Sequence, residues 1–183
     1  MDLLFFDTET TGLGECRLVE LAYAYSPAEA GLVGDPEVVS FRVKPIIPIE
    51  DETVRIHGIT NEMVEHEQYF SERSDYPMLV EIFPQCLAVA HNLPFDRGVL
   101  SREGIGIGQG IDTRLIAKKI WPDCPDYRLQ TLREYLKITV PGEAHTAEGD
   151  VLVLIELFRR EQNELRRIWG DTPQEALTRM ARY

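Results

Sequence analysis

Residues 3–8, LLFFDT, place four large apolar side chains in succession before the chain turns polar at Asp7. An apolar run of this length that ends in polar residues is typical of a strand buried inside a sheet. Such a strand needs a neighbouring strand on each side, and other elements must pack over both faces of the sheet. The start of the sequence therefore predicts the central strand of a layered domain.

Two further segments alternate apolar and polar residues, at 18–25 and 39–43, and are separated by turn residues at 26–36. Three strands with short connections predict an antiparallel meander. From residue 60 onward the pattern becomes helical around one short buried strand at 87–91. Helices are expected at 60–64, 78–86, 94–103, 113–121, 129–136, from 147 through 158, and after Thr172, which forms a capping box with Glu175. The order predicts one α/β domain, a mixed sheet covered by helices.

The composition limits the kinds of molecule that this chain is expected to bind. The chain has 183 residues, 44% of them hydrophobic, which suits one domain with a sizeable core. Its net charge is −12, and residues 1–91 hold 17 acids against 5 bases. Such a chain is not expected to coat duplex DNA, although metal ions can supply the positive charge for a short strand end. With no membrane-length apolar run and three widely spaced cysteines, we expect a cytoplasmic protein.

Five residues are candidates for chemistry. Asp7 and Glu9 lie two apart on a strand, so both carboxylates are expected on one face. Two neighbouring acids suit a hard cation such as Mg²⁺, although a solvated strand end explains an isolated pair at least as well. Asp96 and Asp150 each lie in the first turn of a predicted helix, where a negative charge is favoured without any further function. His145 precedes Asp150 by five residues and, alone, is more typical of a surface residue.

Three motifs are more specific together than apart. FFDTETTGL, AHNLPFD and HTAEGD, in this order, resemble the DEDD exonuclease superfamily, and the histidine five before the last aspartate resembles its DEDDh branch. HGITNEM and the Asp112-Thr113 pair are similar to further family features, and RLIAKKIWP followed by YRLQTL is most similar to the bacterial exonuclease X subfamily. The resemblance covers residues 1–160, the expected exonuclease domain, and leaves 161–183 as a helical C-terminal tail.

The resemblance implies a ribonuclease H-like fold, with a five-stranded mixed sheet whose first three strands are antiparallel. It also implies a 3′→5′ exonuclease that releases nucleoside 5′-monophosphates with two divalent cations, Mg²⁺ with Mn²⁺ able to substitute. Asp7 would bridge the cations, Glu9, Asp96 and Asp150 would complete their ligand shells, and His145 would deprotonate the attacking water.

By the same resemblance, five residues would surround the terminal nucleoside: Thr10, Leu13, His57, Asn92 and Phe95. Phe95 is nearly as well explained as core, and His57 as a polar loop residue. Single-stranded DNA is the favoured substrate, with RNA as an alternative. An RNA-trimming enzyme, a polymerase-proofreading subunit and an inactive strand-end adaptor stay open, as does a homodimer.

Overall fold

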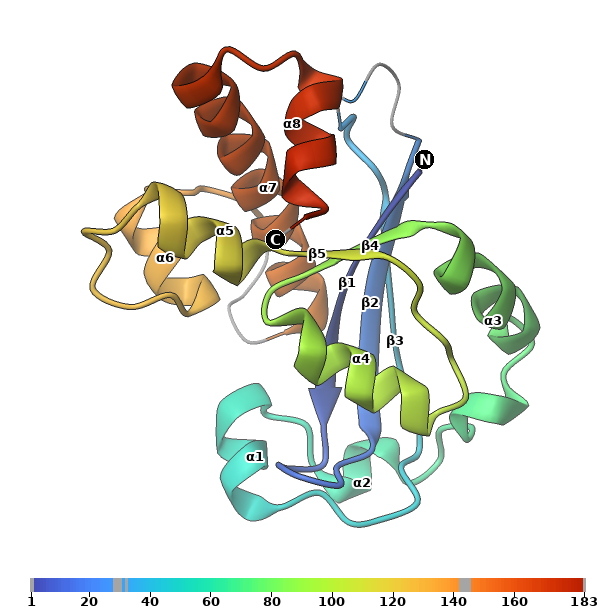
Figure 1. Ribbon diagram of the computed structural model, residues 1–183. Helices are drawn as coiled ribbons and strands as arrows, with labels where there is room; N and C mark the ends of the chain where they lie inside the picture. Colours follow the sequence, from blue (N-terminus) through green and yellow to red (C-terminus); the bar gives the residue numbers. More distant parts are fainter. Residues whose placement is uncertain (1, 28–30, 32, 142–145, 183) are drawn as a thin grey trace.

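The computed structural model describes residues 2–27, 31, 33–141 and 146–182. One sheet with the strand order β3-β2-β1-β4-β5 forms its centre (Figure 1). The strands are β1 (Leu3–Thr10), β2 (Leu18–Ser26), β3 (Val38–Arg42), β4 (Leu87–Ala90) and β5 (Gly110–Asp112). β1 with β2 and β2 with β3 pair antiparallel, whereas β1 with β4 and β4 with β5 pair parallel. The predicted mixed sheet with three antiparallel strands is confirmed.

The central strand β1 sends alternate side chains into two cores. Phe5 meets Phe158 edge to face on one side, with 5.2 Å between the ring centroids. Phe6 meets Phe83 in the same way on the other side, at 5.3 Å. Because side chains on a strand alternate, Asp7 and Glu9 continue the side of Phe5, and Thr8 continues the side of Phe6. Asp7 and Glu9 therefore lie on one side of the sheet, and Thr8 lies on the other side, next to different helices.

The helices cover both faces of the sheet (Figure 1). They are α1 (Asp51–His57), α2 (Asn61–Val64), α3 (Tyr76–Gln85), α4 (Leu93–Arg102), α5 (Thr113–Ile120), α6 (Leu129–Tyr135), α7 (Ala147–Trp169) and α8 (Pro173–Met180), with a 3₁₀ turn, η1 (Phe70–Glu72). α3 and α4 enclose the core that contains Phe6, while α5, α7 and α8 enclose the core that contains Phe5. α1 and α2 lie near the end of the sheet where β1 finishes (Figure 1).

Two helices differ from the sequence prediction. α1 was not predicted, because its residues DETVRIH carry little apolar periodicity, although acids in its first turn and Gly58 in the left-handed conformation after it are helix signals. α7 continues past Phe158 to Trp169, where Gly170 ends it at φ 71°. The predicted capping box of Thr172 and Glu175 is confirmed at the start of α8.

The C-terminal residues continue the same structure. The expected boundary at residue 160 falls inside α7, and α8 adds Ala176, Leu177 and Met180 to the core that contains Phe5. The functional division into 1–160 and 161–183 stays a prediction. Among the helices of the described residues, none combines the length and the apolar character that a membrane crossing requires.

Candidate active site

Three carboxylates meet where β1 ends beside the start of α7. Asp7 and Glu9 come from β1, and Asp150 comes from the first turn of α7. Each offers an oxygen, and these oxygens all lie within 4.8 Å of one another. Thr146 fixes the start of α7, since its hydroxyl accepts from the Gly149 N–H at 3.1 Å. The first turn is therefore held in a defined position opposite the two β1 acids.

Asp96 lies in the first turn of α4 and is 3% exposed. Its Oδ1 accepts two hydrogen bonds from Thr8, one from the hydroxyl at 2.7 Å and one from the backbone N–H at 3.2 Å. Thr8 is the β1 residue between Asp7 and Glu9, so this contact fixes Asp96 beside them. Asp96 nevertheless stands outside the group of three whose oxygens lie within 4.8 Å.

The electrostatics of these acids follow from burial and mutual repulsion. Burial, then the charges of Asp96 and Glu9, raise the pKa of Asp7 well above its usual value. Burial, then the Asp150 charge, raises the pKa of Glu9 to about 8. Burial raises the pKa of Asp96 to about 7 against the opposing effect of the Thr8 hydrogen bond. Buried oxygens that repel one another are stabilised by a shared cation, and an all-oxygen donor set suits Mg²⁺ or Mn²⁺.

Glu20 on β2 is an acid near the cluster that the sequence analysis missed. It pairs directly opposite Glu9 in the sheet and is buried. Its Oε2 accepts from the Ala147 N–H at 3.2 Å, and its Oε1 lies 3.4 Å from Arg42 Nε. Glu20 thus connects β2 to the first residue of α7. The only sequence signal was an acid within an otherwise apolar strand.

A hollow of about 230 Å³ opens beside Glu9. Four of the five predicted nucleoside-binding residues line it, namely Thr10, Leu13, His57 and Phe95. The other lining residues are Thr8, Glu9, Gly12, Glu50, Glu52, Thr53 and Ile56. Several of these belong to α1, which explains why the sequence analysis missed them.

Asn92 does not line this hollow. Its backbone N–H donates to Asp112 Oδ1 at 3.1 Å, and its amide oxygen accepts from Arg114 at 3.2 Å. The residue has φ 75°, a left-handed conformation that asparagine tolerates better than most residues. In the described residues, Asn92 therefore joins the start of α4 to the start of α5.

His57 is a buried part of the hollow. Its Nδ1 accepts from the Ile59 N–H at 3.0 Å, which leaves Nε2 as the donor to the Thr10 carbonyl at 3.1 Å. Burial lowers the pKa of His57. The neutral ring therefore holds the backbone of Thr10 in place.

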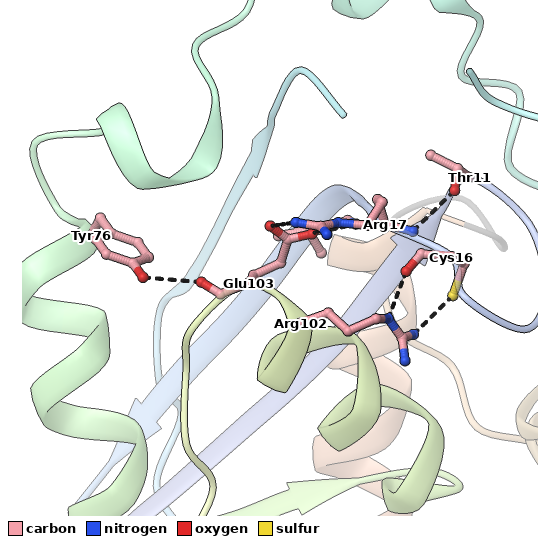
Figure 2. Close-up of polar contacts among 7 residues, drawn as sticks. Thr11, Cys16, Arg17, Tyr76, Arg102 and Glu103 are labelled. Atoms are coloured by element: carbon pink, nitrogen blue, oxygen red, sulfur yellow. Dashed lines mark hydrogen bonds and ion pairs between the residues drawn. The ribbon is translucent and has the colours of Figure 1, made fainter. Parts of the chain in front are cut away.

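The loop between β1 and β2 presents Leu13, which is 83% exposed at the rim of the hollow. Figure 2 shows how the C-terminal end of α4 holds this loop. Arg17 forms two hydrogen bonds with the Glu103 carboxylate, at 2.8 and 3.1 Å, and Arg102 donates to the Cys16 carbonyl at 2.8 Å. The exposed leucine consequently stands on an anchored loop.

His145 lies outside the described residues, so its predicted place beside the carboxylates is untested. The described chain resumes at Thr146, four residues before Asp150. Among the predicted carboxylates, the structure brings Asp7, Glu9 and Asp150 together and holds Asp96 beside them through Thr8.

The chain has clear relatives among known proteins. The model of the exonuclease family RNase_T matches residues 4–158. The chain is 32% identical over 176 residues to the DNA polymerase III subunit epsilon-like protein of Rhodobacter capsulatus, covering 87% of this chain and 23% of that protein. It is 33% identical over 150 residues to Exodeoxyribonuclease 10 of Escherichia coli, covering 78% of this chain and 60% of that protein.

A solved structure, Exonuclease X in complex with 5′ overhanging duplex DNA, superposes with a TM-score of 0.74 and 28% identity. The match covers 98% of this chain and 99% of that chain. The described fold thus agrees with the family match along nearly the whole length. The chain belongs to the RNase_T family of exonucleases.

Proposed function

We propose that the protein is a metal-dependent 3′→5′ exonuclease that releases nucleoside 5′-monophosphates, with DNA as the favoured substrate and RNA as the alternative. The observation that carries the proposal is the meeting of Asp7, Glu9 and Asp150 within 4.8 Å, at the side of a hollow that Glu9 itself lines. An exonuclease needs this combination, because the metal ligands must lie beside the pocket that holds the strand end.

Asp7, Glu9, Asp96 and Asp150 would hold two divalent cations, Mg²⁺ with Mn²⁺ as a substitute. Bound there, the cations would supply an activated water and stabilise the charge on the departing 3′ oxygen. His145 would accept a proton from the attacking water, since an imidazole near its ordinary pKa is suited to that transfer at neutral pH. Glu20 would support this arrangement by holding the first residue of α7.

The hollow would receive the terminal nucleoside. His57 holds the Thr10 carbonyl, and Phe95 presents an apolar surface to the same space. The exposed Leu13 at the rim offers an apolar contact for the last base. The names of the relatives, Exodeoxyribonuclease 10 and Exonuclease X bound to duplex DNA, favour DNA over RNA.

The test uses DNA and RNA oligonucleotides of matched sequence, single-stranded and duplex, digested with Mg²⁺ or Mn²⁺. The label is placed at the 5′ end, so that a ladder shortening from the 3′ end is distinguished from release of internal fragments. We expect stepwise shortening, mononucleotide products and complete inhibition by EDTA. Release of internal fragments, or activity that survives EDTA, would contradict the proposal, and the absence of any cleavage would favour the inactive strand-end adaptor.

A proofreading role beside a polymerase is the second candidate. It is favoured by the relatives whose names include DNA polymerase III epsilon, although this chain spans only 23% of the first of them. Gel filtration of the protein mixed with the replicative polymerase of the same organism tests it. Co-elution as one complex, with removal of a mismatched 3′ nucleotide before extension, is the expected result for this role.

A further inference from the structure

Gln130 joins α6 to the carboxylate cluster. It is the second residue of α6 and is partly buried. Its amide Nε2 donates a hydrogen bond to Asp150 Oδ1 at 2.5 Å. Gln130 is not among the residues expected to be catalytic or substrate-binding. It does not line the hollow, and it is not one of the three residues whose carboxylates meet.

The helix that carries Gln130 is fixed against α7 over its length. Leu132 of α6 is fully buried against Val153 and Leu157 of α7. At the far end of α6, Arg160 of α7 donates to the Leu136 carbonyl. The amide therefore reaches Asp150 from a rigid support, and a hydrogen bond from such a support fixes the orientation of its acceptor.

The chemistry of an amide suits this position. Two members of the cluster, Asp7 and Glu9, are held by β1, whereas Asp150 arrives on a different element and must be aligned with them. An amide N–H stabilises a carboxylate without adding a positive charge that would compete with a cation. Partners that orient metal-binding side chains typically change metal affinity about 10–100-fold when they are lost.

We propose that Gln130 is a positioning residue that orients Asp150 and thereby sets the divalent-cation affinity of the cluster. The inference rests on the proposed function in one respect, namely that the cluster binds a metal. Gln130 is not among the residues that line the hollow, and its side chain donates to Asp150, so its loss should act on metal binding through Asp150.

The experiment is calorimetric titration of Mn²⁺ into the chelator-treated protein, in the absence of nucleic acid. Gln130→Met keeps the length of the side chain and removes the donor, and we expect its Mn²⁺ dissociation constant to rise about 10–100-fold. The matched control is Gln109→Met, since Gln109 is exposed before β5, and it should bind Mn²⁺ as the wild type does. With saturating Mn²⁺, the oligonucleotide-cleaving kcat of Gln130→Met should recover while the Mn²⁺ concentration for half-maximal rate stays raised.

Two comparisons separate the outcomes. Asp150→Asn should lose Mn²⁺ affinity whether or not Gln130 matters. If Asp150→Asn loses affinity and Gln130→Met binds as the wild type does, the role of Gln130 is refuted and the proposed function stands. If Asp150→Asn itself binds normally, the metal site is misplaced and both proposals fall. Gln130→Ala, which removes the donor without placing an apolar side chain beside the Asp150 carboxylate, repeats the test should Gln130→Met not fold.

Discussion

At the scale of single residues, Asp7 is partly exposed and is surrounded by other acids. Asp96, Glu9, Asp150 and Glu20 all contribute negative charge there, which adds to the effect of burial in raising its pKa. We expect Asp7→Asn to reduce metal-dependent cleavage by more than about 10²-fold. Losing a metal ligand should lower activity more than losing a residue that only orients a ligand. The same change should raise the melting temperature of the chelator-treated protein, because it relieves repulsion. Thermal unfolding with EDTA and a cleavage assay test the two effects; wild-type activity would refute the ligand assignment.

His145 is the second residue-scale prediction. Replacing it with Asn removes the expected proton acceptor, so kcat should fall about 10²–10⁴-fold while strand affinity stays nearly unchanged. The acidic limb of the pH–rate profile should disappear or move, because a histidine no longer has to lose its proton. A normal kcat combined with weaker strand binding would instead assign His145 to holding the substrate.

At the scale of elements, α7 carries a buried acid away from the cluster. Glu161 is 0% exposed, and no hydrogen-bond partner for either carboxylate oxygen lies among the residues that the structure describes. Burial, with a smaller contribution from Asp112, raises the pKa of Glu161 well above 4.5. A carboxyl with a higher pKa in the folded state stabilises the fold at low pH. That contribution is lost as the pH rises above the ordinary value.

Glu161→Gln cannot ionise, so its stability relative to the wild type should increase with pH. Between pH 5 and pH 8, we expect the melting-temperature difference in favour of the variant to grow by roughly 2–8 °C. Glu164→Gln is the control on the same helix, because Arg167 lowers the pKa of Glu164 and predicts no such gain. A difference between Glu161→Gln and wild type that is the same at every pH would contradict the prediction.

The elements also show what the sequence could and could not predict. The period of two along β1 correctly placed Asp7 and Glu9 on one face, and the antiparallel strands followed from alternation and turns. α1 was not predicted, because its seven mostly polar residues show no clear apolar stripe at helical spacing. Thr53 and Ile56, which belong to α1 and line the hollow, were missed for the same reason. The Gln130–Asp150 and Thr8–Asp96 bonds join residues 20 and 88 positions apart. Such contacts depend on how helices pack on the sheet, which no local pattern encodes.

At the scale of the whole molecule, the charge is unevenly distributed and many of its bases are already engaged. The first half holds all the excess negative charge. In the second half, Arg102 binds the Cys16 carbonyl, Arg114 binds the Asn92 amide, and Arg97 binds the Gly108 carbonyl. Arg128 lies 3.6 Å from the carboxylate of Asp126. Favourable contact with a polyanion should therefore be confined to the few nucleotides nearest the proposed cation site.

Few phosphate contacts release few counterions, so strand affinity should fall only gently as salt rises. We expect a log–log salt slope of about −2 to −3, against roughly −6 or steeper for a protein that holds many phosphates. Affinity should also depend more on divalent cation than on strand length beyond a short minimum. The measurement titrates fluorescent oligonucleotides of increasing length against His145→Asn, which keeps the carboxylates and should cleave slowly. One series contains Ca²⁺, and a parallel series without Ca²⁺ gives the contribution of the cation. An affinity that keeps rising with duplex length, together with a steep slope, would reveal an extended binding surface that the charge distribution does not predict.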